Sequence, residues 1–126
     1  MGKALGVGGV FFKSKDPQKL IAWYSKYLHI EKTEYGTVNF LPVNMPENSL
    51  TVFSPFPDDT NYFEPSDQIF MFNLVVDDLD EVLKQVQDGG AELSGEVQEF
   101  EYGRFGWFID PDGNKVELWE PIKGEE

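Results

Sequence analysis

The sequence has no cysteine and only one histidine, His29, among its 126 residues. The absence of cysteine excludes disulfides, thiolate metal sites and a cysteine nucleophile. Long apolar runs are also missing, since no stretch approaches the roughly 20 residues that cross a bilayer as a helix. The first residues do not have the apolar run of a secretory signal either. We therefore expect a soluble cytoplasmic protein that binds no membrane.

Basic residues are scarce as well. Ten lysines and arginines stand against 23 aspartates and glutamates, which gives a net charge of −13 at pH 7. A charge of this sign repels phosphate backbones, and no basic patch interrupts it, so we expect no nucleic-acid partner. The acidic balance either serves solubility alone or favours cationic and neutral ligands. Aromatic residues, in contrast, are plentiful, with 11 Phe, 5 Tyr and 3 Trp, enough for a core and for a binding surface.

Two segments predict amphipathic helices. The first follows Asp16, a suitable N-cap, with Pro17 at the first helical position, where its missing N–H costs nothing. The second follows Asp77 or Asp78 and ends at the glycine pair 89–90, as a left-handed C-terminal cap requires. Apolar residues recur in each at a spacing of three to four: Leu20, Trp23, Tyr24, Tyr27 and Leu28 in the first, and Leu79, Val82, Leu83 and Val86 in the second.

The chain contains an internal repeat. Each predicted helix follows an apolar, strand-like run (7–14 or 69–76) and precedes several short strand candidates. The segment NSLTVFSP (48–55) lies over NKVELWEP (114–121) with an offset of 66 positions, 114 against 48. We therefore predict an α+β protein with a single domain (1–126) made of two βαβββ modules, 4–53 and 68–122. A linker rich in Pro and Asp, 54–67, joins them.

A duplicated βαβββ unit ending in a DPDGN-x-x-E-L strand resembles the vicinal oxygen chelate superfamily, which includes glyoxalase I, extradiol dioxygenases and bleomycin-resistance proteins. The resemblance covers nearly the whole chain and rests on DPDGNKVELW (110–119), VVDDLDEVLKQVQDGGAEL (75–93) and SKDPQKLIAWYSKYL (14–28). It implies a cupped mixed sheet with the ligand in the cup. It also implies a homodimer, and leaves open whether modules pair within one chain or exchange between two.

The last hairpin can be derived from its residues. The sequence at 110–113, DPDG, suits a type I turn followed by a glycine with positive φ, so that Trp107 pairs with Glu117. Strand alternation then places Lys115, Glu117 and Trp119 on one face, which we expect to line the cup. The apolar residues between them face a helix.

The superfamily resemblance can be tested at its metal positions. Metal-dependent members use His or Gln in the first strand of each module and Glu or His in the last. The corresponding positions here are Gly9, Met71, Thr51 and Glu117. Only Glu117 is of ligand type, so we predict no metal site and no cofactor. His29 follows the first predicted helix, where a helix end favours it, and its role stays open.

The leading hypothesis is therefore a metal-free small-molecule-binding protein, and the sequence leaves open whether it is an enzyme. Tryptophan faces beside a carboxylate suit an aromatic or cationic ligand. Two alternatives remain: a metal-dependent lyase, isomerase or dioxygenase that uses Glu117 as its catalytic group, and a protein-interaction module with a filled cup. The predicted ligand-binding residues are Phe11, Thr51, Phe53, Met71, Asn73, Arg104, Trp107, Glu117 and Trp119.

Residues near the rim of the cup carry further hypotheses. Three roles are open for Arg104: it pairs with Glu117 across the cup, it orients an anionic group of the ligand, or it forms only a surface salt bridge. The linker aromatics Phe56, Tyr62 and Phe63 either close over the cup or pack on a partner chain.

Overall fold

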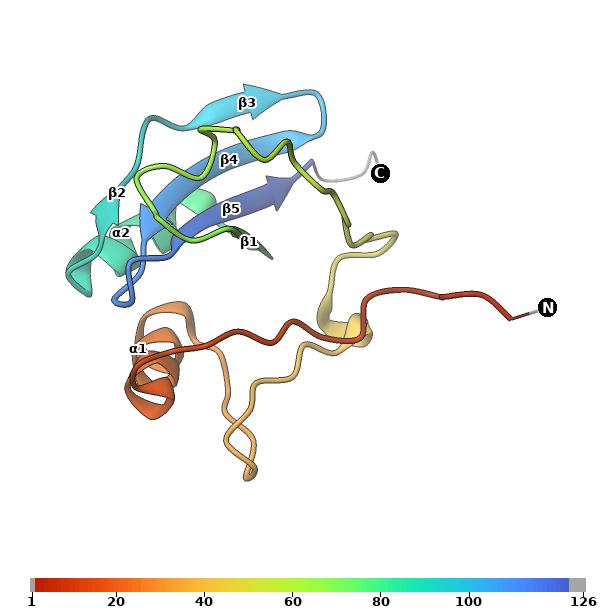
Figure 1. The fold of residues 1–126 in the computed structure, drawn as a ribbon, viewed down its shortest axis with the longest axis horizontal. Helices are drawn as coiled ribbons and strands as arrows, with labels where there is room; N and C mark the ends of the chain where they lie inside the picture. Colours follow the sequence, from red (N-terminus) through yellow and green to blue (C-terminus); the bar gives the residue numbers. More distant parts are fainter. Residues whose placement is uncertain (1, 123–126) are drawn as a thin grey trace.

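The computed structural model describes residues 2–122, and Figure 1 shows that they contain a mixed sheet. The sheet order is β1-β5-β4-β2, with β3 also paired to β4. β1 runs parallel to β5, and the other pairs are antiparallel. The predicted α+β class with a mixed sheet is confirmed. The strands are β1 (Phe72–Val75), β2 (Glu92–Leu93), β3 (Gln98–Phe100), β4 (Gly103–Ile109) and β5 (Lys115–Pro121); the helices are α1 (Pro17–Leu28), α2 (Leu79–Asp88) and the short 3-10 helix η1 (Pro42–Asn44).

Both long helices begin and end where the sequence predicts. Asp16 accepts a hydrogen bond from the backbone N of Lys19 at 3.2 Å, and Asp78 accepts one from Glu81 at the same distance. These two aspartates satisfy backbone donors that have no partner within the helix. After α2, Gly90 takes the left-handed conformation, with φ of 90°. None of the helices in residues 2–122 has the length and apolar character needed to cross a bilayer.

The hairpin between β4 and β5 forms as its turn sequence predicts. Gly113 has φ of 84°, and its backbone N donates to the carbonyl of Asp110 at 2.9 Å. The backbone N of Asp110 donates in turn to the carbonyl of Asn114, also at 2.9 Å. The turn sets the register in which Trp107 lies opposite Glu117. The predicted pairing is therefore confirmed.

The core lies between α2 and one face of the sheet. Its fully buried side chains come from α2, β4 and β5. α2 can approach β4 closely because Gly106 has no side chain: a Cβ there would lie 3.1 Å from Leu83 Cδ1 and 3.3 Å from Leu79 Cδ1. The apolar residues between Lys115 and Trp119 thus face a helix, as predicted. The largest of the fully buried residues are Phe108, Leu79, Leu118, Val86 and Val116.

Helix α1 packs beside α2 and against the end of the β4–β5 hairpin. The indole Nε1 of Trp23 donates to the carbonyl of Gly89 at 2.9 Å, and the hydroxyl of Tyr24 donates to Asp110 Oδ2 at 2.8 Å. Burial and the neighbouring Asp110 carboxylate raise the pKa of Tyr24. These polar contacts join the first half of the chain to the second.

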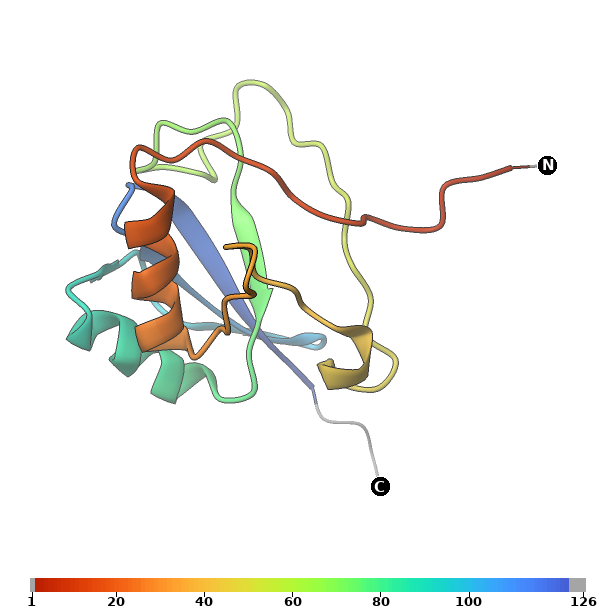
Figure 2. The same ribbon diagram turned by 90° about the horizontal axis from the view of Figure 1, so that it is seen from below.

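The first half of the chain contains less sheet than predicted. The segments 7–14 and 48–55, predicted as strands, pair with no other strand among residues 2–122. The only bridge that the structure describes within residues 2–69 joins Lys32 to Val38. A strand is held by hydrogen bonds to a neighbour, and neither segment has one. Both run as extended chain in Figures 1 and 2. Residues 1 and 123–126 of the predicted domain lie outside the described part.

Truncating Phe108 to alanine tests the core. This ring is fully buried between α2 and the sheet, so we expect Phe108→Ala to lower the free energy of unfolding by about 3–5 kcal/mol. Urea titration followed by circular dichroism measures the loss. Tyr35→Ala is the control, because that side chain is 85% exposed and its removal should change the value by less than about 0.5 kcal/mol. Equal losses in the two variants would contradict the assigned core.

Candidate functional site

Three polar side chains lie in one row across the sheet. The parallel pairing of β1 with β5 places Asn73 beside Glu117, and the antiparallel pairing of β4 with β5 places Trp107 on its other side. Asn73 Nδ2 donates to Glu117 Oε1 at 2.6 Å, and Trp107 Nε1 donates to Glu117 Oε2 at 3.0 Å. We call the surface that carries Asn73, Trp107, Lys115, Glu117 and Trp119 the carboxylate face. It is the side of the sheet turned away from α2.

The linker crosses the carboxylate face. The hydroxyl of Tyr62 donates to Glu117 Oε2, and its ring meets the ring of Trp107 edge-on, with centroids 6.4 Å apart. Phe56 stacks on Tyr62 at 5.6 Å with an angle of 12° between the rings. Figures 1 and 2 show the linker on the side of the sheet opposite the two long helices. Phe56 and Tyr62 therefore lie over this face, as the first alternative predicts, and packing of the linker on a partner chain stays a prediction.

Lys115 brings a positive charge to the same face. Its side chain is only 9% exposed, and Nζ donates to the backbone carbonyl of Tyr62 at 2.7 Å. Nζ also lies 5.1 Å from the ring centroid of Tyr62 and 5.9 Å from that of Trp107. Burial lowers the pKa of Lys115, while the carboxylates of Glu117 and Glu64 oppose that shift. The carboxylate face therefore holds one acid and one base two positions apart on β5.

The phenol of Tyr62 is held in its protonated form. Burial raises its pKa, and so do the hydrogen bond to Glu117 and the charge of that carboxylate. A phenolate beside Glu117 would place two negative charges in contact. Tyr62 is thus a hydrogen-bond donor at neutral pH.

A second aromatic row extends the carboxylate face. Trp119 stacks on Phe105, with ring centroids 5.8 Å apart and 9° between the planes. Its indole Nε1 donates to the carbonyl of Tyr102 at 3.0 Å, which fixes the ring. Trp119 points to the same side as Glu117, two residues along β5. On the carboxylate face, aromatic rings therefore lie beside the two charged residues Glu117 and Lys115.

Several predicted site residues do not lie in this row. Phe11 and Phe53 are 96% and 83% exposed, and Thr51 is exposed as well, so none of them packs against Glu117. Met71 is half-buried just before β1. The reason is that the segments carrying Phe11, Thr51 and Phe53 have not joined the sheet. Their place in a binding site stays a prediction.

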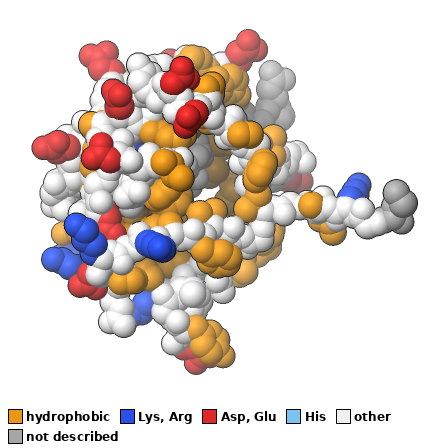
Figure 3. All heavy atoms as spheres, viewed as in Figure 1, with side chains coloured by type: hydrophobic (Ala, Val, Ile, Leu, Met, Phe, Trp, Pro, Cys, Tyr) orange, Lys and Arg blue, Asp and Glu red, His pale blue; other side chains and the backbone are white. Residues whose placement is uncertain are grey.

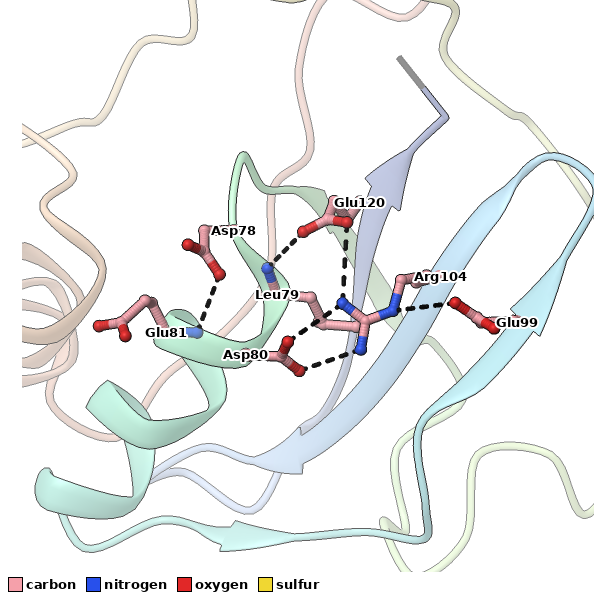
Figure 4. A network of polar contacts seen from close by, with 7 residues as sticks. All are labelled: Asp78, Leu79, Asp80, Glu81, Glu99, Arg104 and Glu120. Carbon is pink, nitrogen blue, oxygen red and sulfur yellow. Dashed lines mark hydrogen bonds and ion pairs between the residues drawn. The ribbon is translucent and has the colours of Figure 1, made fainter.

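Arg104 lies on the other side of the sheet, which Figure 4 shows. Its Nη2 lies 3.0 Å from Asp80 Oδ1, its Nε 3.5 Å from Glu99 and its Nη1 3.8 Å from Glu120. Glu120 also accepts a hydrogen bond from the first backbone N–H of α2 at 2.8 Å. Of the three alternatives for Arg104, the structure shows the surface salt bridge and not the pairing with Glu117, because strand alternation turns the guanidinium toward α2. Its surface ion pairs tie the start of α2 to the sheet.

Glu117 is the only residue of ligand type at the four positions that metal-dependent members of the superfamily use, and its hydrogen bonds do not fit a metal ion. Glu117 accepts hydrogen bonds at both oxygens, from Asn73 at one and from Trp107 and Tyr62 at the other. Those donors direct hydrogen atoms at the lone pairs that a cation would need. Residues 2–122 contain no group of three or more His, Asp or Glu side chains arranged to hold an ion. No chemistry of this face is therefore assigned to a metal.

The single histidine lies elsewhere. His29 ends α1 in the left-handed conformation, with φ of 57°. It lines an open surface hollow of about 490 Å³ together with Ser25, Ile30, Glu31 and Lys32. His29 is therefore a helix-end residue in the position that the sequence indicates.

Sequence reasoning missed two members of the site. Strand alternation placed Lys115 on the right face, but nothing in the pattern assigned it a role. Tyr62 was expected to close over the cup or to pack on a partner chain, and no sequence signal links a linker tyrosine to a glutamate 55 positions away. Both roles follow from the path of the linker.

Replacing Glu117 by glutamine tests the bond to Tyr62. The change removes the negative charge that favours the protonated phenol, so we expect the pKa of Tyr62 to fall toward its ordinary value of about 10. Tyrosinate absorbance at high pH, with Tyr62→Phe subtracted in both the wild-type and the Glu117→Gln background, isolates this group. Glu99→Gln is the control, because Glu99 pairs with Arg104 instead. An unchanged Tyr62 titration in Glu117→Gln would contradict the contact.

Comparison with known proteins agrees with the fold. A family model described as a glyoxalase-like domain matches residues 9–119. A search of curated proteins gives no significant match. Among solved structures, the chain is similar to a member of the glyoxalase/bleomycin resistance protein/dioxygenase superfamily from Sphaerobacter thermophilus DSM 20745, with 22% identity, a TM-score of 0.50 and coverage of 85% of this chain and 90% of that one.

A second solved structure is TnmS3, an antibiotic binding protein from Streptomyces sp. CB03234, with 22% identity, a TM-score of 0.49 and coverage of 86% of this chain and 88% of that one. Likeness at such identity concerns the fold alone. The family match, however, spans most of the chain and confirms the resemblance found in its motifs. The chain belongs to the glyoxalase-like domain family of the vicinal oxygen chelate superfamily.

Proposed function

We propose that this protein binds a small molecule on the carboxylate face without the help of a metal ion. The observation that carries the proposal is the Glu117 carboxylate, which neutral donors hold in place among aromatic rings. Such an arrangement suits a small-molecule site, where a few fixed polar groups orient a ligand against apolar walls. Three donors already occupy three of the roughly four lone-pair positions of the carboxylate, which argues against the metal-dependent enzyme.

The ligand is aromatic or cationic. Trp119 is half-buried and stacks on the buried Phe105, and the buried Trp107 lies against the ring of Tyr62. A flat ligand in the place of the Tyr62 ring gains both burial and stacking there. A cation would gain from the rings and from the acidic balance of the whole chain, whose net charge is −13. A cationic ligand would lie near the positive charge of Lys115, whereas a neutral aromatic ligand would not be repelled by it.

We further propose that the protein works as a homodimer in which the segments 7–14 and 48–55 become strands against a second copy. Their backbones have no sheet partner within the part of the chain that the structure describes, and apolar side chains along them face solvent, including Val10, Phe11, Val52 and Phe53. Figure 3 shows such side chains along the amino-terminal segment that ends at the right of the view. Extended apolar segments with unpaired backbone groups tend to pair with a sheet edge or to pack on the surface of a partner. Pairing with a second copy would complete the first of the two predicted modules.

Ligand titration tests the binding function. Benzamide and benzyltrimethylammonium represent the neutral and cationic aromatic classes, and tryptophan fluorescence reports their arrival near Trp107 and Trp119. We expect at least one of them to bind, and Glu117→Gln to weaken that binding about tenfold or more, because hydrogen bonds to a charged group are strong. Glu99→Gln, on the other face, should bind as the wild type does. Stoichiometric metal in the purified protein, lost in Glu117→Ala, would overturn the metal-free proposal.

Sedimentation equilibrium tests the dimer. We expect the wild type to approach twice the monomer mass of 14.4 kDa as its concentration rises, and Phe53→Asp to shift the equilibrium toward monomer, because a charge would have to be buried at the interface. Tyr35→Asp is the matched control, since Tyr35 is exposed but lies outside both segments. A wild type that stays monomeric at all concentrations would overturn this proposal.

A further inference from the structure

One residue of the linker contacts both charged groups of the carboxylate face. The hydroxyl of Tyr62 donates to Glu117 Oε2, and its backbone carbonyl accepts from Lys115 Nζ at 2.7 Å. Its ring lies between these two ends, 5.1 Å from Lys115 Nζ and edge-on to Trp107. Tyr62 thus offers the face a donor, an aromatic ring and an acceptor in a single unit.

Tyr62 differs from the other partners of Glu117 in how it is held. Asn73 and Trp107 sit on strands paired with β5, so the sheet register fixes their donor groups. Tyr62 lies outside the sheet, and it is 37% exposed whereas Trp107 is only 6% exposed. Its hydrogen bonds can be exchanged for those of another molecule without breaking any strand pairing.

The charges of the face restrict what such a molecule can be. Lys115 is buried, and the ion pairs found within residues 2–122 all involve Arg104, so the ammonium of Lys115 relies on a carbonyl and on ring faces. A cationic ligand drawn to Glu117 would enter beside this ammonium, and an anionic ligand drawn to Lys115 would enter beside Glu117. Like charges in a buried site are costly. A neutral ligand with one donor and one acceptor satisfies both groups.

We infer that the site takes a neutral aromatic ligand with a hydroxyl group at one end and a carbonyl group at the other, and that Tyr62 occupies this position until the ligand replaces it. The inference rests on the proposed binding function and narrows its ligand to phenolic amides, ketones or esters. The ligand hydroxyl donates to Glu117, and its carbonyl accepts from Lys115. The linker around Tyr62 moves aside when the ligand binds.

Three small aromatic probes separate the contributions of the hydroxyl group, the carbonyl group and the charge of the ligand to binding. N-acetyltyrosinamide carries both groups and no charge, N-acetylphenylalaninamide has no hydroxyl, and tyramine has a hydroxyl but replaces the carbonyl end with a cation. Each is titrated into the wild type and into Tyr62→Ala, with tryptophan fluorescence excited at a wavelength where tyrosine does not absorb. Tyr35→Ala is the matched surface control.

We expect Tyr62→Ala to bind N-acetyltyrosinamide at least tenfold more tightly than the wild type does, because the internal competitor is gone. In that variant, N-acetylphenylalaninamide and tyramine should each bind about tenfold more weakly than N-acetyltyrosinamide. Tyr35→Ala should match the wild type. If Tyr62→Ala does not fold by circular dichroism, Tyr62→Phe serves instead, since it keeps the ring and loses the donor; it should still bind N-acetyltyrosinamide more tightly than the wild type.

Other outcomes overturn the inference. Unchanged or weaker binding of N-acetyltyrosinamide by Tyr62→Ala would mean that Tyr62 does not compete with the ligand. Equal binding of N-acetylphenylalaninamide would remove the hydroxyl from the ligand class, and a preference for tyramine would establish a cationic ligand. In these cases the binding function itself stands if benzamide or benzyltrimethylammonium still binds in a manner that depends on Glu117. Absence of binding by every probe and every variant overturns both.

Discussion

The pairing of β4 with β5 depends on the turn at 110–113, and the rest of the site depends on that pairing. Gly113 supplies the positive φ and Asp110 closes the loop by backbone hydrogen bonds on both sides. The Asp110 carboxylate also accepts from the backbone N and side chain of Asn114 and from the hydroxyl of Tyr24. A slip of one residue would turn Glu117 toward α2 and place an apolar residue on the carboxylate face. The same turn therefore fixes the register and the position of Glu117 on the carboxylate face.

The two faces of the sheet have opposite tasks. On one face, Gly106 lets α2 lie close, and the ion pairs of Arg104 hold the start of that helix. The buried side chains there are almost entirely apolar, so this face provides the stability. On the other face, the buried Lys115 and the half-buried Glu117 both have hydrogen-bond partners, which avoids the cost of unsatisfied burial. The packed apolar face thus holds the sheet rigid, and the opposite face carries the polar site.

The linker covers the carboxylate face, and the first half of the chain contains segments that do not join the sheet. Tyr62 satisfies both charged groups from outside the sheet, so the site is complete in the absence of any other molecule. The unpaired segments 7–14 and 48–55 leave apolar side chains in solvent, although α1 from the same half is firmly attached through Trp23 and Tyr24. The second half of the chain thus forms the sheet, and the first half leaves two extended apolar segments exposed.

The sequence alone determined the helices, the last hairpin and the division of β5 into two faces, because each rests on contacts between residues close in sequence. Caps such as Asp16 and Asp78, the DPDG turn and strand alternation act over a few positions, and they placed Glu117 beside Trp107 correctly. Tertiary structure alone decided the rest. Tyr62 reaches Glu117 only because of the path of a linker, and Arg104 faces α2 because its strand turns it there. Strand formation at 7–14 and 48–55 needs a partner edge, and periodicity within a segment carries no information about whether that edge is present.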